Sequence, residues 1–430
     1  MIPPPAHAVG RLDGRTILRY AHAYESGGGL EQYLADLNLA LCQRSRLTIV
    51  QMQMTTDRMR LAETEETIGG SRIVKVPLWV PPESKHASIN ARPPGALARF
   101  KTALRNRLVF TPAVYHAVAK RVLQNWPVPR RSGEPAAAGA KFKELLTRFP
   151  VDLVAVHSCG GSDASEMLTA ASRARLPAVI IHHFANDRFK SFALCRQAMQ
   201  ARAVGGVCGV AVPAYLRERF TNLADGIDVD FFRRENARPV SPAFADPILF
   251  LPARITPTKG QLDLIRAGGK LLQEGVRFQI VFAGRVDSEA HLADLKKAIT
   301  TAGLTERVYF TGQLDAAGLR DWYAAAAILA FPTHHHEGLP RILLEAQAMA
   351  LPVVVHEIGG TADGVKSGET GFLIPENDPA QLVQRLRELL QNPAQREQFG
   401  QAGRRWIESR FSLTCLAERH ELFYCQVSNL

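Results

Sequence analysis

The sequence predicts a two-domain α/β protein in which crossover helices connect the strands of parallel sheets. The chain has 430 residues, which is too long for a single hydrophobic core and suits two domains. Short β-branched and apolar runs alternate with helical segments through both halves, a pattern typical of parallel sheets. Apolar residues make up 46% of the chain and charged residues 22%, the composition of an ordinary globular protein.

The predicted strands fall into two blocks. Those of the first block are Ile17–Ala23, Leu47–Gln51, Ile73–Leu78, Leu153–His157, Ala178–His182 and Val207–Val212. Those of the second block are Ile248–Pro252, Phe278–Ala283, Val308–Thr311, Ile328–Phe331 and Val353–His356. The blocks meet in a turn-rich stretch near 236–246. We therefore expect a disordered tail at 1–15, domains at 16–235 and 236–410, and a last helix within 411–430.

Positive charge is concentrated in the first half of the chain. Residues 1–235 hold 32 Lys/Arg against 20 Asp/Glu, or +12, whereas residues 236–430 hold 20 against 21, or −1. No acidic residue occurs between Glu83 and Glu134, where Leu97, Phe100 and Leu104 recur at helical spacing. The bases of this interval are Lys85, Arg92, Arg99, Lys101, Arg105, Arg107, Lys120, Arg121, Arg130 and Arg131. Residues 85–131 thus favour an anionic membrane surface as partner over a solvated basic face, and no nucleic-acid recognition motif accompanies them.

Cysteine usage and hydropathy favour a cytoplasmic protein. The six cysteines are Cys42, Cys159, Cys195, Cys208, Cys415 and Cys425. They form no C-x-x-C pair, so we expect reduced thiols. No apolar run approaches the roughly 18 residues that a membrane span requires. The N-terminus lacks a basic region followed by an apolar stretch, so we expect no secretory signal, and the membrane contact, if made, would be peripheral.

The most informative segment of the chain contains Glu337 and Glu345, eight positions apart. Glu337 lies in a Gly/Pro turn after the predicted strand Ile328–Phe331. Pro340 can open a helix, because proline at the first helical position loses no hydrogen bond. Glu345 then falls one turn into that helix, on the flank of its apolar stripe.

The start of this helix is a predicted anion site. Free backbone N–H groups at Gly338 and Leu339, with the positive end of the helix dipole behind them, favour a phosphate. The carboxylates of Glu337 and Glu345 can accept hydrogen bonds from hydroxyls. A phosphate site beside hydroxyl acceptors suits a nucleotide-sugar, although a capped surface helix with two solvated glutamates would show the same spacing.

Two further loops carry residues suited to a phosphate. Arg254 and Lys259 lie five positions apart in a proline-containing loop after the predicted strand Ile248–Pro252. Both can point at one diphosphate, the arginine bidentately and the lysine as a point charge. Gly28 and Gly29 follow the first predicted strand, where backbone amides could approach a phosphate closely, as they could in a plain flexible turn.

The spacing Glu337-x7-Glu345 resembles the paired-glutamate motif of retaining GT-B glycosyltransferases, in particular the large glycosyltransferase family 4. The similarity continues through Leu351–Val355, Gly359–Gly360, Gly368–Ile374 and Asp378–Pro379. The resemblance implies a GT-B fold, with two Rossmann-like doubly wound domains facing across a cleft. It also implies that the C-terminal helix crosses back to the N-terminal domain.

The resemblance further implies the roles of the domains and of the site residues. The domain at 16–235 would bind the acceptor and the domain at 236–410 the nucleotide-sugar. The implied donor-binding residues are Gly28, Gly29, Arg254, Lys259, Gly284, Glu337, Gly338, Leu339, Pro340 and Glu345. Arg254, Lys259, Glu337 and His157 would act in catalysis. Gly284 belongs to the loop Ala283–Asp287, which with His334–His336 is expected to set the preference for base and sugar.

Histidines at strand ends are candidates in the first domain. A lone histidine such as His157 is more often structural, and it is the resemblance that places it beside the reacting carbon of the donor sugar. His182 and His183 end the next strand and are candidates for the acceptor side.

Two patterns resemble metal sites and are not expected to bind metal. Asp228 and Asp230 have the Asp-x-Asp form of the GT-A transferases, but their segment resembles the one that precedes the second GT-B domain. His334–His336 are consecutive loop residues that cannot easily converge on one tetrahedral centre. We expect one of these histidines to border the donor sugar and the others to be solvated. Neither a metal nor another cofactor is expected.

The sequence therefore predicts a metal-independent retaining glycosyltransferase. It would move a sugar from a nucleotide-diphosphate sugar to an acceptor hydroxyl in bacterial polysaccharide or lipid-linked glycan assembly. The alternatives are a nucleotide-sugar epimerase, a phosphorylase with pyridoxal phosphate, glycosylation of a soluble small molecule, and a non-catalytic carbohydrate- or membrane-binding module.

Overall fold

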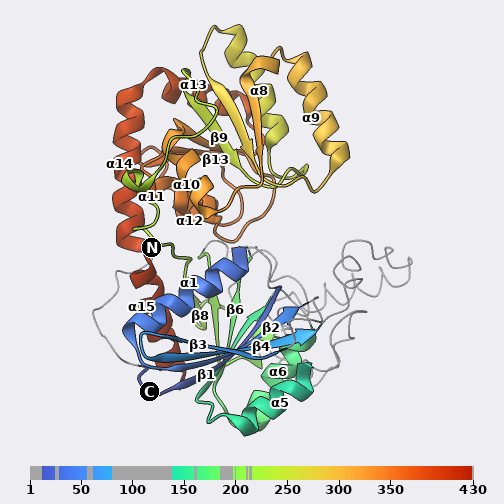
Figure 1. Cartoon of the computed structure of the whole chain (residues 1–430), viewed down its shortest axis with the longest axis vertical. Coiled ribbons are helices and arrows are strands. Elements are labelled where there is room, and N and C mark those ends of the chain that lie inside the picture. The colour runs from blue at the N-terminus through green and yellow to red at the C-terminus, as the bar shows by residue number, and fades with distance from the viewer. Residues whose placement is uncertain are drawn as a thin grey trace. The chain divides into compact units, whose positions relative to one another are not determined.

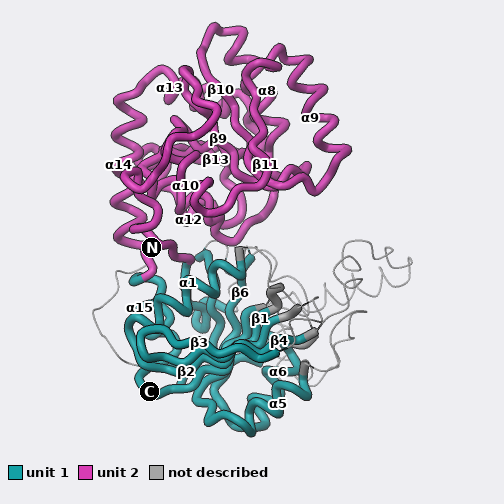
Figure 2. Tube along the Cα trace, viewed as in Figure 1, with its two compact units in different colours: residues 1–224, 414–430 teal, residues 225–413 magenta. Residues whose placement is uncertain are grey.

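The computed structural model describes residues 12–24, 29–55, 62–79, 138–158, 162–184, 197–198, 200–209, 212 and 216–428. The chain divides into two compact units (Figure 2). Unit 1 comprises Met1–Ala224 and Thr414–Leu430, and unit 2 comprises Asp225–Leu413. The basic stretch 85–131 and Gly28 lie outside the described residues. No helix in the described part of the chain has both the length and the apolar character needed to span a membrane.

Unit 1 is built on a sheet whose described strands run in the order β3-β4-β2-β1-β5-β6-β7-β8 (Figure 1). All neighbouring strands are parallel except the pair β3–β4. The strands are β1 Thr16–Tyr24, β2 Thr48–Thr55, β3 Thr64–Ile68, β4 Ser71–Trp79, β5 Leu153–Ser158, β6 Ala178–His182, β7 Ala203–Gly206 and β8 Phe220–Asn222. The helices are α1 Gly29–Arg44, α5 Ala138–Arg148, α6 Ser162–Arg173 and α15 Leu413–Ser428.

The two faces of this sheet differ in polarity, because successive side chains of a strand point to opposite faces. Leu18 and Tyr20 of β1 join the apolar cluster that contains Phe142 of α5 and Met167 of α6. Arg19, between them, faces the opposite way and bonds Asn38 of α1. Helices α1 and α15 therefore cover a face of the sheet that carries polar groups, while α5 and α6 cover the apolar face (Figure 1).

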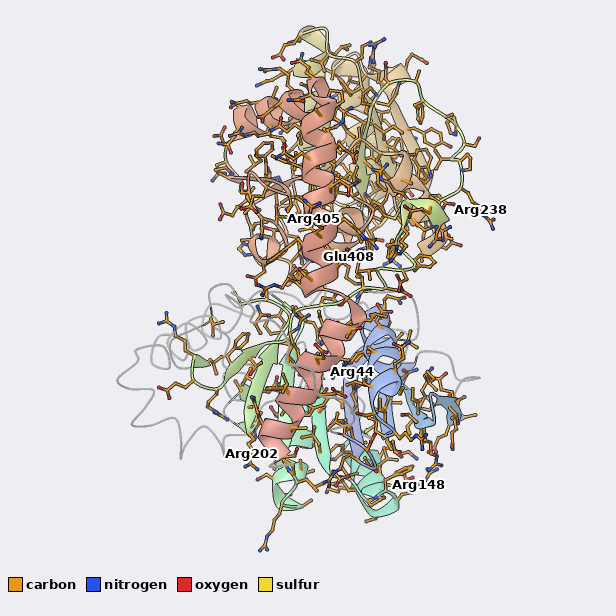
Figure 3. All side chains as sticks on the ribbon, turned by 90° about the vertical axis from the view of Figure 1, so that its left-hand side faces the viewer. Arg44, Arg148, Arg202, Arg238, Arg405 and Glu408 are labelled. Atoms are coloured by element: carbon orange, nitrogen blue, oxygen red, sulfur yellow. The ribbon has the colours of Figure 1, made fainter. Side chains whose placement is uncertain are left out.

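The last helix packs against α1 through buried polar contacts. Tyr33 Oη and His420 Nε2 are 2.9 Å apart, and the other ring nitrogen of His420 is 2.9 Å from the carbonyl of Leu416. Arg44 at the end of α1 forms ion pairs with Glu418 at 3.1 Å and with Glu421 at 3.0 Å. Figure 3 shows Arg44 where these two helices meet. Helix α15 is thus a part of unit 1, although it follows the whole of unit 2 in the sequence.

The boundary between the units lies at Asp225, ahead of the position 236 expected from the sequence. Hydrogen bonds explain the difference. The amide of Ile227 donates to the carbonyl of Phe411, and Arg341 donates to the carboxylate of Asp225 at 2.9 Å. These contacts fix the segment before the turn-rich stretch to unit 2.

Unit 2 is built on a parallel sheet in the order β11-β10-β9-β12-β13-β14 (Figure 1). The strands are β9 Ile248–Pro252, β10 Gln279–Ala283, β11 Val308–Gly312, β12 Ile328–Phe331, β13 Val353–His356 and β14 Gly371–Ile374. The helices are α8 Gln261–Gln273, α9 Glu289–Thr301, α10 Ala316–Ala325, α11 Arg341–Ala348, α12 Thr361–Gly364, α13 Pro379–Gln391 and α14 Pro393–Arg410, with 3-10 turns η5 Arg234–Asn236 and η6 Thr305–Arg307. The predicted pair of parallel α/β sheets is confirmed.

One predicted strand is wrong. Residues 207–209, from the predicted strand Val207–Val212, follow β7 without strand structure, and the strand itself is Ala203–Gly206. It contains the two glycines Gly205 and Gly206. In the structure they allow close packing, since a Cβ atom on Gly206 would lie 2.6 Å from the ring of Phe220 on the next strand. The short edge strand β3 was also missed, because its residues are polar and almost all exposed.

Candidate functional site

The strand order of unit 2 places two of the predicted loops next to each other. Strands β9 and β12 are neighbours, but the chain leaves them toward opposite edges of the sheet. Ligands of open α/β sheets bind at the carboxyl ends of the strands at such a switch point. The loops that follow these two strands are also bonded together. The carbonyl of Thr258 accepts from the amide of His334 at 2.9 Å and from the hydroxyl of Thr333 at 3.2 Å.

Lys259 and Glu337 form an ion pair at this switch point. The side chains are 12% and 22% exposed, so the pair is largely shielded from solvent. The ammonium group of Lys259 also lies 5.9 Å from the ring centroid of Phe331. Burial by itself raises the pKa of Glu337, but a hydrogen bond from His335 and the charge of Lys259 outweigh it and lower that pKa to about 2. Glu337 is therefore an ionised acceptor at neutral pH.

Glycines hold the backbone of Glu337 in place. Gly359 follows β13 with a positive φ of +58°, and a Cβ atom there would lie 2.4 Å from the carbonyl oxygen of Glu337. The amide of Gly360 donates to the same oxygen at 3.0 Å. Gly359 and Gly360, which follow β13, thus support the loop that carries Glu337, and any side chain at position 359 would displace that loop.

Arg254 lies on the same edge of the sheet with a different carboxylate. Its guanidinium bonds Asp287 at 2.6 Å, and Arg285 bonds the other oxygen of that carboxylate at 2.7 Å. The side chain of Arg254 is 55% exposed, far more than that of Lys259. Gly284 brings these loops together, because a Cβ atom on it would lie 2.3 Å from the carbonyl of Ala253. A diphosphate at this edge would compete with Asp287 for Arg254.

Helix α11 begins one residue later than predicted. Pro340 is the N-cap, with an extended ψ of 119°, and Arg341 is the first helical residue. The amide groups at the start of any α-helix lack intrahelical partners, and those of α11 follow directly on Gly338 and Leu339. The amides that would bind an anion therefore lie at the predicted end of the helix, one residue further along the chain.

Glu345 is buried within unit 2, with an exposure of 9%. Tyr323 Oη donates to one of its oxygens at 3.0 Å, and Arg341 Nε lies 3.8 Å from the other. Burial and the negative charge of Glu345 raise the pKa of Tyr323 well above its usual value. The sequence places Glu345 one turn into the helix, but Tyr323 comes from α10 and has no signal in the motif.

The sequence predicts one of His334–His336 at the donor sugar and the others in solvent, and the structure gives His334 two carboxylate partners. Its two ring nitrogens bond Glu376 at 2.7 Å and Asp263 at 2.6 Å. His335 Nδ1 lies 3.4 Å from Glu337, so this histidine also has a carboxylate neighbour. The two contacts of His334 could not be predicted from the sequence, because Asp263 and Glu376 are far from His334 along the chain.

In unit 1 the structure brings His157 and His183 together. His157 is the last residue but one of β5, at the switch point between β1 and β5, and its Nδ1 lies 2.9 Å from His183 Nε2. The ring of Tyr33 packs edge-on against His183 with centroids 4.6 Å apart. His157 Nε2 is buried and has no hydrogen-bond partner among the described residues. His182 points elsewhere, with its ring 4.8 Å from that of Phe184. Gly29 is the first residue of α1.

His157, His183 and His420 of unit 1 are neutral at physiological pH. Burial, repulsion between the charged forms of His157 and His183, and the charge of Arg19 lower the pKa of His157 well below its usual value. Burial and Arg19 lower the pKa of His183 to about 3, and burial lowers that of His420 to about 3. A neutral imidazole carries one donor and one acceptor, so the His157–His183 bond needs no added charge.

Asp228 and Asp230 have structural partners. Asp228 accepts hydrogen bonds from the amides of Asp230 and Phe231, both at 2.9 Å, which closes a local turn. Asp230 pairs with Arg233 at 2.8 Å. The two carboxylates thus stabilise the local structure of the segment at the start of unit 2.

Residues 233–406 match the family described as Glycosyl transferases group 1. The chain is 30% identical over 213 residues to a GDP-mannose-dependent monoacylated alpha-(1-6)-phosphatidylinositol monomannoside mannosyltransferase of Corynebacterium glutamicum, a match that covers 46% of this chain and 54% of that protein. It is 35% identical over 195 residues to a D-inositol 3-phosphate glycosyltransferase of Kineococcus radiotolerans, covering 41% and 44%. The matches thus span about half the length of these curated relatives.

Solved structures match almost the whole chain. Sucrose-phosphate synthase from Thermosynechococcus elongatus has a TM-score of 0.68 and 18% identity, with 96% of this chain and 98% of that chain covered. Anabaena HepE in complex with UDP and glucose has a TM-score of 0.66 and 16% identity, with 97% and 100% covered. The fold is that of the GT-B enzymes, as the resemblance implied. The comparisons lend no support to a nucleotide-sugar epimerase.

Proposed function

Since residues 233–406 form a group 1 glycosyl transferase domain in a chain with a GT-B fold, we propose that this protein transfers a sugar from a nucleotide-diphosphate sugar to an acceptor hydroxyl. The observation that carries the proposal is the shielded Lys259–Glu337 pair at the switch point of the unit 2 sheet. It joins a cation for a diphosphate to a carboxylate for sugar hydroxyls.

The remaining site residues of unit 2 support the same ligand. Arg254 and the amides at the start of α11 would share the charge of the diphosphate with Lys259. Glu345 would accept from the ribose hydroxyls. An arrangement with two cations and a helix start at one strand edge exceeds what a non-catalytic carbohydrate-binding module requires, since such a module has no diphosphate to hold.

The proposed reaction is a substitution at the anomeric carbon with retained configuration. The bond from this carbon to the diphosphate oxygen breaks, and the electron pair leaves with the diphosphate. The acceptor oxygen forms the new bond on the same face, and its proton passes to the departing diphosphate. Lys259 and Arg254 would stabilise the charge that develops on the diphosphate. In unit 1, the unpartnered Nε2 of His157 would hydrogen-bond a sugar hydroxyl.

A thermal-shift screen with nucleoside diphosphates and nucleotide-sugars tests the function. A ligand at 100 times its dissociation constant should add about 2.7 kcal/mol of stability. The stabilising nucleotide-sugar is then incubated with candidate acceptors, and NMR of the product reads the anomeric configuration. Stabilisation by no nucleotide in the screen would contradict the proposal, and an inverted product would contradict retention.

Turnover should survive the removal of divalent cations. Lys259 and Arg254 supply the positive charge that GT-A enzymes take from a metal ion. Activity is measured with and without EDTA, and then with added manganese or magnesium. Complete loss with EDTA that manganese restores would favour a metal site at Asp228 and Asp230.

We also propose a lipid-linked or polysaccharide acceptor at an anionic membrane surface. The support is the +12 charge of residues 1–235 and the acid-free interval with ten bases at 85–131, together with the phosphatidylinositol mannoside named for the Corynebacterium relative.

Pelleting with phosphatidylglycerol vesicles should accordingly be strong at low salt and weak at physiological salt, where the Debye length is about 8 Å. The quadruple change of Arg99, Lys101, Arg105 and Arg107 to Gln should abolish pelleting and leave nucleotide binding intact. Equal recovery of both proteins from anionic and neutral vesicles would instead favour a soluble small-molecule acceptor.

A further inference from the structure

His334 is bonded through both of its ring nitrogens. Nδ1 lies 2.7 Å from a carboxylate oxygen of Glu376, and Nε2 lies 2.6 Å from one of Asp263. An ionised carboxylate only accepts hydrogen bonds, so both nitrogens must donate, and the ring is then an imidazolium. This is the arrangement of a charged clamp rather than of a histidine exposed on a loop.

The clamp joins three strand ends of unit 2. His334 follows β12, Asp263 lies in the first turn of α8 after the β9 loop, and Glu376 follows β14. The backbone of His334 is also bonded to the β9 loop, because its amide donates to the carbonyl of Thr258 at 2.9 Å. His334 therefore fixes the spacing between loops that come from separate parts of the chain.

Both members of the Lys259–Glu337 pair lie directly beside this clamp. Lys259 follows Thr258, and Glu337 is three residues beyond His334. We propose that His334, held between Asp263 and Glu376, is a positioning residue that keeps Lys259 and Glu337 in place for the diphosphate and the sugar. This inference rests on the donor-binding function proposed above and assigns no contact between His334 and substrate.

The surroundings of His334 predict how the clamp responds to pH. Burial lowers the pKa of His334, but the hydrogen bonds to Asp263 and Glu376 outweigh it and raise that pKa above its usual value. The other facing groups are His356, with ring centroids 5.2 Å apart, and Arg266, which lies 3.8 Å from Asp263. Burial lowers the pKa of His356, so it stays neutral.

The sign of the effect follows from the raised pKa. A group whose pKa is raised on folding contributes stability that is complete below its unfolded pKa and is lost as the pH rises through its folded pKa. The clamp is therefore complete below about pH 6.5 and is lost as the pH rises through the raised pKa of His334. Nucleotide binding should weaken over the same range.

The first test reads the clamp without any nucleotide. NMR titration of the full chain should place the His334 pKa above that of an ordinary histidine. The hydrogen-exchange protection factors of the amides of Glu337 and Gly338, which correct for the intrinsic rise of exchange with pH, should fall as His334 loses its proton. Asp263→Asn combined with Glu376→Gln should remove both effects, because amides keep hydrogen bonds to a neutral ring and no longer favour the imidazolium. Two results would overturn the proposal: a His334 pKa no higher than that of an ordinary histidine, or exchange protection at Glu337 and Gly338 that does not change as His334 titrates.

The second test reads nucleotide binding and turnover. UDP and GDP are titrated by calorimetry into the wild type and the Asp263→Asn/Glu376→Gln variant from pH 6 to pH 9. The wild type should lose affinity relative to the variant as the pH rises. Ionisation of the nucleotide phosphate affects both proteins equally, so it cancels in the ratio of the two affinities. His334→Asn should lower kcat/KM for the donor on the order of tenfold to a hundredfold, since small misplacements in a site have effects of this size. His291→Asn, on α9, is the matched control and should change neither property.

The outcomes separate this inference from the function on which it rests. Binding of UDP or GDP with the same pH profile in both proteins would overturn the positioning role and leave the transferase intact. If no nucleotide of the thermal-shift screen binds, the proposed function fails, and the protection factors at Glu337 and Gly338 still decide whether His334 holds the loop. Should His334→Asn fail to fold, the double amide variant carries the test alone.

Discussion

Replacing Lys259 with alanine should weaken the binding of UDP or GDP by about tenfold to a hundredfold. The change removes a charge-assisted contact to the diphosphate, and such a contact contributes about 1.5–3 kcal/mol. It also leaves Glu337 without the cation that lowers its pKa, so a largely shielded carboxylate would repel the incoming phosphate. Calorimetry with each nucleotide measures the effect.

Neighbouring variants make this experiment specific. Arg254→Ala should weaken binding in the same direction but less, because the Arg254 side chain is 55% exposed and already bonded to Asp287. Arg387→Ala is the control, since Arg387 also pairs with a carboxylate of unit 2, that of Glu274, and has no assigned role toward the donor. Glu337→Gln should abolish turnover and keep nucleoside diphosphate binding. Unchanged affinity in both Lys259→Ala and Arg254→Ala would remove these residues from the site.

Replacing Arg44 with methionine should destabilise unit 1 by about 3–5 kcal/mol, the usual effect of removing one partner of a buried ion pair. Arg44 bonds both Glu418 and Glu421, whose side chains are only 3% and 1% exposed. Without the guanidinium, two carboxylates of α15 would remain buried beside each other. The free energy of unfolding is measured by urea denaturation followed by circular dichroism.

The matched control is Arg72→Met in the same unit. Arg72 pairs with Glu65, but both side chains are about half exposed at 47% and 49%, so solvent replaces the lost partner. Its urea midpoint should shift much less than that of Arg44→Met. Equal midpoints for the two variants would show that the α1–α15 ion pairs do not hold the last helix in place.

Much of the fold could be predicted because its signals are local. Five of the six described strands of unit 2 lie at predicted apolar runs, and the observed β9 and β12 coincide with the predicted Ile248–Pro252 and Ile328–Phe331, whereas β14 was not predicted. The glycine-rich strand Ala203–Gly206 was missed because its conformation depends on packing against Phe220 and not on its own side chains. Residues 85–131 lie outside the described part, so the membrane contact stays a prediction.

The sequence by itself predicted the residues of the proposed site. Arg254, Lys259, Glu337 and Glu345 could be recognised because each motif is complete within a few residues of chain. Only the tertiary structure decided their partners: Lys259 with Glu337, Arg254 with Asp287, and His334 between Asp263 and Glu376. The physical reason is the strand order, because the switch from β9 to β12 places loops side by side that are remote along the chain. Periodicity reveals which face of an element is buried, but it carries no information about which other strand end lies next to it.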